Sequence, residues 1–175
     1  MESTPAILLR RTRLTETSLI VTWFTEKHGK LKTVAKGARR PRSPFAGKLD
    51  LFYEADIQFT WSTRSELHGL REVALKDPHE GLGKAYRRTL LASYFVELIE
   101  LVTEPEHPAP ELFNLLRRAF GYLEANEPTR RALDHFEVET ARLLGIHQPG
   151  QASIAIGRVY HRLPKGRAEL LRQLS

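Results

Sequence analysis

Basic side chains concentrate in the first fifty residues, and they are the residues of this chain best suited to binding a polyanion. The first fifty residues contain eleven Lys and Arg against four Asp and Glu, a net charge of +7, whereas the remaining 125 residues carry a net charge of −1. Phosphates attract such charges, and binding releases counterions. The asymmetry predicts a polyanionic partner for this part of the chain. The alternative is a basic surface that only maintains solubility.

The candidate phosphate-binding residues lie on a predicted strand and in the loop that follows it. We expect the strongest contacts from Lys32, Lys36, Arg39, Arg40 and Arg42. The second candidates are Arg10, Arg11, Arg13, Lys27 and Lys30. An exposed aromatic ring near these cations could stack on a base. The aromatic residues nearby in sequence, each expected more often in a core, are Trp23, Phe24, Phe45, Phe52 and Tyr53.

No other group of residues has the pattern of a catalytic or metal site. The chain lacks Cys, which excludes disulfides, thiolate zinc sites and a cysteine nucleophile. Its seven His residues show no ligand spacing such as His-Glu-x-x-His. Two carboxylate pairs of the kind used in acid–base chemistry, Glu97 with Glu100 and Glu137 with Glu139, fall in amphipathic patterns and are interpreted as solvated helix faces. We therefore expect no enzymatic activity, no metal and no cofactor.

Length and composition favour a folded protein of one or two domains. The chain has 175 residues, of which 41% are hydrophobic, enough for a packed core. The first residues lack a basic leader followed by a long apolar run. No stretch approaches the ~20 apolar residues that a membrane-spanning helix needs. We expect no membrane association and a cytoplasmic location.

The first half of the chain has the residue pattern of short β-strands. Residues 51–61 alternate between apolar and mostly polar side chains with period two. Gly29 permits a positive φ in a hairpin turn. The five candidate strands are residues 6–9, 18–24, 31–35, 51–61 and 67–75. Five short strands predict a small closed barrel or a sandwich.

The second half changes to helical periodicity. Apolar residues recur three and four apart in residues 84–102 and again in two later segments. Pro128 is placed in the first turn of the third helix, and Gly145 is expected to end it. Residues 146–163 are interpreted as a loop or weak strand, and Pro164 as the start of a last short helix. The sequence therefore predicts an α+β chain with a β domain at residues 1–78 and a helical domain at residues 79–175.

Three motifs between residues 16 and 43 point to one family. Glu-Thr precedes the second strand, Phe-Thr-x-x-x-Gly-Lys spans the turn, and Ala-Lys-Gly-Ala-Arg-Arg-x-x-Ser leaves the third strand. Leu49-x-Leu51-Phe52 and the long alternating strand extend the pattern. In these features and in the order of its elements, the chain resembles the bacterial RecO recombination and repair family.

The resemblance implies a fold and a function. The fold would be a five-stranded oligonucleotide/oligosaccharide-binding (OB) barrel followed by an all-helical domain. The function would be binding of single- and double-stranded DNA, strand annealing, and cooperation with RecR in loading RecA, at the nucleoid. The family also implies recognition of the acidic tail of single-stranded-DNA-binding protein. For that tail we consider four arginines in the helical half: Arg87, Arg88, Arg117 and Arg118.

The chain departs from the family in its C-terminal half. Many RecO-like proteins carry a cysteine zinc module after the helix that ends near residue 145. Because this chain has no Cys and a short segment after Gly145, we expect a compact member without that module. The departure puts in doubt any partner contact that relatives make there.

Three other interpretations use the same residues. The first is an RNA-binding module on the same kind of barrel. The second is a protein–protein adaptor whose basic loop binds an acidic partner. The third is a nuclease, which would need carboxylates near the basic loop, where the sequence offers Glu26, Asp50, Glu54 and Asp56.

Overall fold

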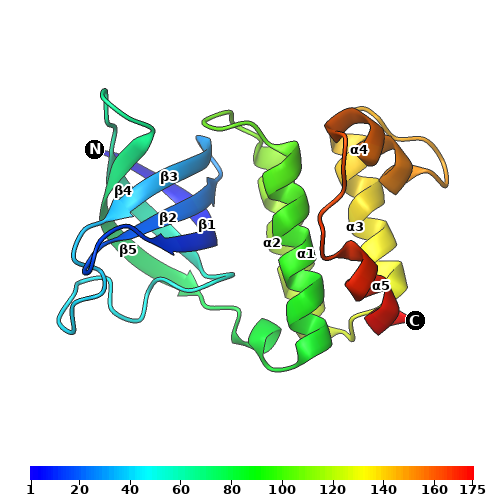
Figure 1. Ribbon diagram of the computed structural model, residues 1–175, viewed down its shortest axis with the longest axis horizontal. Helices are drawn as coiled ribbons and strands as arrows, with labels where there is room; N and C mark the ends of the chain where they lie inside the picture. The colour runs from blue at the N-terminus through cyan, green and yellow to red at the C-terminus, as the bar shows by residue number, and fades with distance from the viewer. The chain divides into compact units, whose positions relative to one another are not determined.

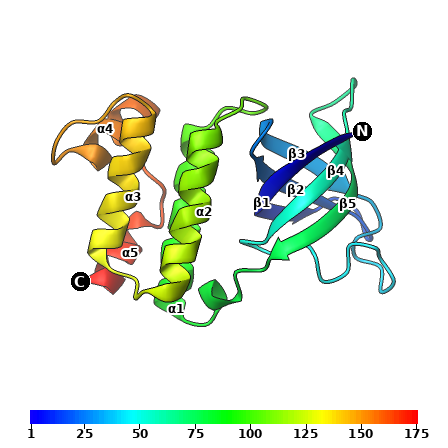
Figure 2. The ribbon, with the colours of Figure 1, turned by 180° about the vertical axis from the view of Figure 1, so that it is seen from behind.

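A computed structural model describes all 175 residues, and the chain divides into two compact units (Figures 1 and 2). The first unit comprises Met1–Pro78 together with the separate segment Thr103–Pro110. The second comprises His79–Val102 and Glu111–Ser175. The first unit carries all the strands and the second the helices, as the change of period in the sequence predicts.

The first unit is a closed five-stranded barrel, which confirms the OB-fold prediction. The strands are β1 (Glu2–Arg13), β2 (Leu19–Thr25), β3 (Gly29–Ala35), β4 (Glu54–Thr60) and β5 (Leu67–Asp77). Their order around the barrel is β1-β2-β3-β5-β4, with β3 and β5 parallel and the other pairs antiparallel. β1 pairs with β4 through its first half and with β2 through its second, and its register shifts between Leu8 and Arg10. Such a shift lets one long strand bend around the barrel.

Alternation along the strands separates the barrel core from its surface. In β3 the side chains of Leu31, Thr33 and Ala35 are buried, whereas Lys32 is exposed. Trp23 lies fully inside and donates from Nε1 to Thr33 Oγ1 at 3.1 Å, so its one polar group is satisfied within the core. The barrel is therefore a packed core and carries its charges outside.

The fourth strand is shorter than the sequence pattern predicts. The alternation over residues 51–61 indicated one strand, but pairing begins only at Glu54. Phe52 has a φ of 72°, in the left-handed region. Outside the β4 ladder, the Phe52 N–H donates to the Leu8 carbonyl at 3.2 Å, and the Leu8 N–H donates to the Tyr53 carbonyl at 2.9 Å. The backbone turn at this residue leaves Leu51 exposed and buries the Phe52 ring.

The loop between the first two long helices packs on the barrel rather than with the helices. Lys30 of β3 forms an isolated bridge with Pro105, and its carbonyl accepts from the Glu106 N–H at 2.8 Å. The buried His68 ring of β5 pairs with the Glu106 carboxylate. Segment Thr103–Pro110 is thus tied to β3 and β5 through residues far away in sequence.

The second unit contains a short 3₁₀ turn and five helices, of which α1, α2 and α3 run side by side (Figures 1 and 2). The elements are η1 (Glu80–Gly83), α1 (Tyr86–Val102), α2 (Pro110–Ala125), α3 (Arg130–Leu143), α4 (Ala152–Tyr160) and α5 (Arg167–Leu174). Gly145, at a φ of 74°, ends α3 as predicted. None of the helices has the length and apolar character that crossing a membrane requires.

Three helix predictions need correction. Residues 152–160 form α4, although residues 146–163 were expected to be a loop or weak strand; Ala155 and Ile156 are buried and anchor this short helix. Pro128 lies before α3, because Thr129 is the N-cap and its side chain accepts from the Ala132 N–H. The last helix begins at Arg167, later than Pro164 suggested.

Glu137 is a further correction, since it does not lie on a solvated helix face. Its side chain is 3% exposed and accepts two hydrogen bonds from Arg167, at 2.8 and 2.9 Å. Tyr94 donates its hydroxyl to the same carboxylate. Burial, with Glu137 beside it, raises the pKa of Tyr94 above its usual value. The three residues join α1, α3 and the start of α5 inside the helical unit.

Candidate nucleic-acid interface

Three neighbouring strands place predicted cations in one row on the barrel. Arg10 of β1 pairs in register with Thr22 of β2, and Thr22 with Lys32 of β3. Neighbouring strands lie roughly 4.8 Å apart. Arg10 and Lys32 are both exposed. The row therefore places two cations about two strand spacings apart on the barrel surface.

The loop after β3 is held in place by the loop between β1 and β2. The Gly37 N–H donates to Ser18 Oγ at 3.2 Å, and the Arg39 N–H donates to the Thr17 carbonyl at 2.8 Å. The Arg39 guanidinium donates to the Glu16 carbonyl at 3.0 Å. Because these bonds fix the loop backbone, its arginines start from a defined position on the barrel.

Residues 27–42 contain seven Lys and Arg and no carboxylate. Five of these cations are exposed and make no ion pair within the protein: Lys27, Lys32, Lys36, Arg40 and Arg42. We call these five residues the open cations. Their charge is unbalanced by neighbouring protein groups, which leaves it available to an external anion.

Other predicted cations already have partners within the protein. Lys30 is half-buried, and its Nζ donates to the Thr103 carbonyl at 3.1 Å. Arg11 donates to the Leu49 carbonyl and lies 3.4 Å from Asp50. Arg13 pairs with Glu16 at 2.7 Å. These three would have to exchange or share their partners to bind a phosphate.

The aromatic residues that were considered for stacking belong mainly to the barrel interior. Trp23, Phe24, Phe45 and Phe52 are buried, and Tyr53 is half-buried. The exposed aromatic residue of the barrel is Trp61, which directly follows β4. Trp61 was not among the stacking candidates taken from the sequence. In the alternation over residues 51–61, Trp61 falls on the same face as the buried Ile57 and Phe59, so the pattern predicted that it would be buried. The signal against burial was the turn sequence Ser-Thr-Arg-Ser directly after it.

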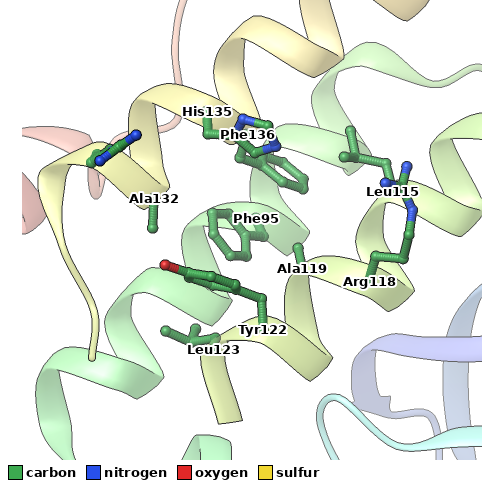
Figure 3. Close-up of a pocket in the computed structure, with 10 residues that line it drawn as sticks. Phe95, Leu115, Arg118, Ala119, Tyr122, Leu123, Ala132, His135 and Phe136 are labelled. Atoms are coloured by element: carbon green, nitrogen blue, oxygen red, sulfur yellow. The ribbon is translucent and has the colours of Figure 1, made fainter. Parts of the chain in front are cut away.

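The four arginines considered for an acidic tail have different surroundings. Arg87 and Arg88 donate to the carbonyls of Pro128 and Asn126. Arg117 donates to Asn114 and lies over the Phe113 ring. Arg118 alone lines a cavity of about 530 Å³ in the helical unit (Figure 3).

That cavity combines an aromatic wall with basic residues. The rings of Phe95 and Phe136 are stacked 4.1 Å apart, and Tyr122 lies close to them (Figure 3). Arg118 and Arg131 contribute positive charge to the lining. An apolar hollow with cations in its lining suits an acidic peptide that carries a hydrophobic side chain.

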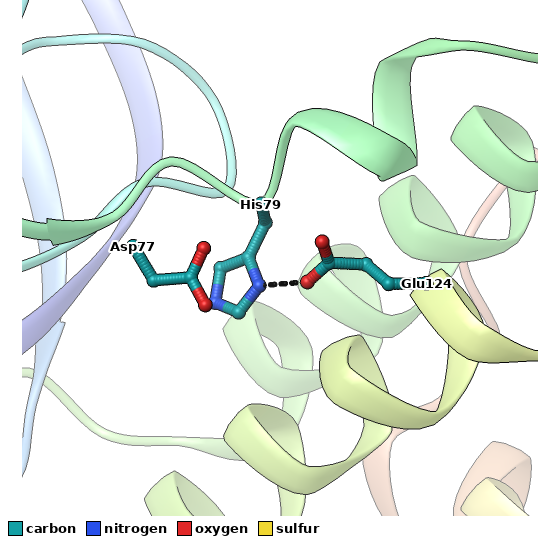
Figure 4. A group of neighbouring side chains, drawn as sticks. All are labelled: Asp77, His79 and Glu124. Carbon is teal, nitrogen blue, oxygen red and sulfur yellow. Dashed lines mark hydrogen bonds and ion pairs between the residues drawn. The ribbon is translucent and has the colours of Figure 1, made fainter.

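A buried histidine–carboxylate pair fastens the start of the helical unit. His79 Nδ1 hydrogen-bonds to Glu124 near the end of α2 (Figure 4). The His79 side chain is buried and its φ is 45°, where the chain turns into η1. This contact positions η1 and has no evident part in binding nucleic acid.

Comparison with known proteins gives two family matches and several relatives. The family description "Recombination protein O N terminal" matches residues 1–79, and "Recombination protein O C terminal" matches residues 83–157. Proteins named "DNA repair protein RecO" from Syntrophus aciditrophicus and Rhodopirellula baltica are 32% and 33% identical over 81% and 87% of this chain. One from Methylococcus capsulatus is 36% identical over 80%. The chain covers 55%, 57% and 56% of these relatives, just over half of their length.

Proposed function

Because the chain belongs to the RecO family, we propose that it is a DNA-binding mediator of recombinational repair that works at the nucleoid. In this proposal it binds single- and double-stranded DNA, anneals complementary strands, and assists RecA loading together with RecR. It needs no cofactor and catalyses no reaction. The observation that carries the proposal is the group of open cations on an ordered strand and loop of an OB barrel.

Electrostatics connects these cations to annealing. Two DNA strands repel each other through their phosphates, and cations that neutralise phosphates reduce that repulsion. Phosphate contacts carry no sequence information, so the protein would act on any sequence. This is the property that a general repair mediator needs.

A salt series with a matched control tests the DNA interface. In the test variant, Lys36, Arg39, Arg40 and Arg42 are changed together to Ala. In the control variant, four exposed cations of the helical unit are changed: Lys84, Arg158, Arg162 and Lys165. Both variants lose four charges. We expect only the test variant to bind oligonucleotides weakly and with a flatter dependence on salt. Equal losses in the two variants would reject the proposed interface.

The rival functions make different predictions in the same assay. An RNA-binding module would prefer an RNA oligonucleotide to the matched DNA in direct competition. An adaptor would show no appreciable oligonucleotide affinity even at low salt. A nuclease would cleave DNA when a divalent metal is added. Against the nuclease, Asp50 is paired with Arg11, Asp56 with Lys76, and Glu54 is buried.

We also propose that the cavity of the helical unit binds the acidic tail of single-stranded-DNA-binding protein. The lining supports this, because Arg118 and Arg131 adjoin an apolar wall. A labelled peptide copying that tail should bind the protein, and Arg118→Ala with Arg131→Ala should weaken binding. Arg87→Ala is the control, since Arg87 is not part of the lining. Equal weakening by Arg87→Ala would argue against the cavity as the binding site.

A further inference from the structure

Trp61 has an environment unlike that of the other tryptophan of the chain. Trp23 is fully buried in the barrel, whereas Trp61 is 40% exposed. Trp61 opens the loop of residues 61–66, which joins β4 to β5. The other residues of this loop, Ser-Thr-Arg-Ser-Glu, are all polar or charged.

Three neighbouring rings hold the Trp61 indole without stacking on it. The ring centroids of His28, Phe59 and His68 lie 5.3, 4.9 and 4.6 Å from that of Trp61. The planes of all three are nearly perpendicular to the indole, at 89°, 77° and 79°. No aromatic neighbour is stacked parallel to the indole, and 40% of the residue's surface remains open to solvent.

The support of the indole is itself fixed. His68 is buried, its Nδ1 accepts from the Ser62 N–H at 3.0 Å, and its Nε2 pairs with Glu106. The Ser62 hydroxyl accepts from the N–H groups of Arg64 and Ser65, each at 3.2 Å. The loop that carries Trp61 is therefore ordered by its own hydrogen bonds, which lowers the entropy lost when a ligand binds.

Cations of the proposed DNA interface lie beside this loop in the strand order. The loop leads into β5, whose first residue, Leu67, pairs with Lys32. Lys27 directly precedes His28, which contacts the indole. Arg64, in the loop itself, is exposed. The carboxylates of this region are the exposed Glu66 in the loop, Glu2, which lies beside His28, and Glu106, which lies beside His68.

We propose that Trp61 is a stacking platform for an unpaired DNA base, while Lys27, Lys32 and Arg64 bind the adjacent phosphates. The proposal rests on the DNA-binding function and adds the form of DNA that this site selects. In a duplex each base is covered by its neighbours, so only a single strand offers a free face to the indole. Stacking on aromatic residues is tolerant of sequence, and the β4–β5 loop of OB barrels is a common place for oligonucleotide contacts.

Tryptophan fluorescence and binding titrations with a thymidine homopolymer test the proposal. Binding should quench the emission of the wild-type protein, and Trp61→Phe should abolish that change because the remaining Trp23 is buried. Trp61→Ala should weaken single-strand binding roughly tenfold and leave binding of a duplex of equal length unchanged. Trp61→Phe should restore part of the affinity. Tyr86→Ala is the matched control, since Tyr86 is another exposed aromatic residue, in the helical unit.

An oligomer of abasic sites separates stacking from charge. It keeps the phosphates but offers no base, so the wild type and Trp61→Ala should bind it equally. If Trp61→Ala binds the thymidine homopolymer as tightly as the wild type, the stacking site is rejected while the DNA-binding function stands. If the wild type binds no DNA at low salt, both are rejected. Thermal unfolding of each variant separates a lost contact from a lost fold.

Discussion

Gly29 lies so close to the backbone of His107 that a Cβ on this glycine would stand 2.1 Å from the His107 carbonyl oxygen. Gly29 also has a φ of +71°, a backbone conformation that residues with a Cβ rarely adopt. The residue therefore serves two purposes at once. It turns the chain between β2 and β3, and it admits segment Thr103–Pro110 against the barrel.

Gly29→Ala should destabilise the barrel unit more than a change in φ alone explains. The backbone strain accounts for about 1–3 kcal/mol, and the collision with His107 adds to it because the backbone of His107 cannot move without shifting its segment. Gly47→Ala is the control, since Gly47 has a φ of +74° and open space at its Cβ. Urea unfolding of both variants measures the difference. Equal losses of stability would show that the contact with His107 does not matter.

Glu137→Ala should destabilise the helical unit strongly. The change leaves Arg167 and Tyr94 without the carboxylate that they share, and removing one partner of a buried ion pair typically costs about 3–5 kcal/mol. Glu139→Ala on the same helix removes a more exposed pair with Arg142 and should cost at most about 1 kcal/mol. Chemical denaturation compares the two. A similar cost for both would mean that Glu137 contributes no more than a surface pair.

Tyr94 should ionise only when the helical unit unfolds. Its pKa is raised in the folded state by burial and by Glu137. The folded protein therefore keeps this proton more tightly than the unfolded chain, and stability falls as the pH rises above the ordinary tyrosine pKa of about 10. Tyrosinate absorbance followed during alkaline titration should show a late component that coincides with loss of helical circular dichroism. The late component should be missing in Tyr94→Phe; its persistence there would assign it to another tyrosine.

The open cations should contribute more to the salt dependence of DNA binding than the cations that already have a partner in the protein. Arg40→Ala should reduce the slope of log K against the logarithm of the salt concentration by about one, since one phosphate contact is lost. Arg13→Ala should change it less, because Arg13 already pairs with Glu16 at 2.7 Å. Titrations of one oligonucleotide at several salt concentrations give both slopes. A larger effect of Arg13→Ala would reverse the proposed order.

Patterns that depend on neighbours in sequence predicted much of the fold. The predicted strand at residues 31–35 forms the larger part of β3, in which Leu31, Thr33 and Ala35 are buried and Lys32 is exposed. The glycine at residue 145 marked the end of α3 correctly. Periodicity failed where a single residue interrupts it, as Phe52 does with its φ of 72° at the start of the expected strand. It also failed for α4, because this helix has only nine residues and is flanked by Gly, Pro and His, so its period is difficult to recognise.

The sequence by itself determined the basic first fifty residues, the period-two and helical segments, and the motifs of the RecO family, because each is encoded by residues close together in the chain. Only the tertiary structure decided which cations remain open, since Lys30 meets Thr103 across 73 positions of sequence. It also exposed Trp61 and buried Glu137, against the expectations from their patterns. Burial and pairing depend on groups that the fold brings together from distant parts of the chain. Local patterns of residue types therefore cannot predict these long-range contacts.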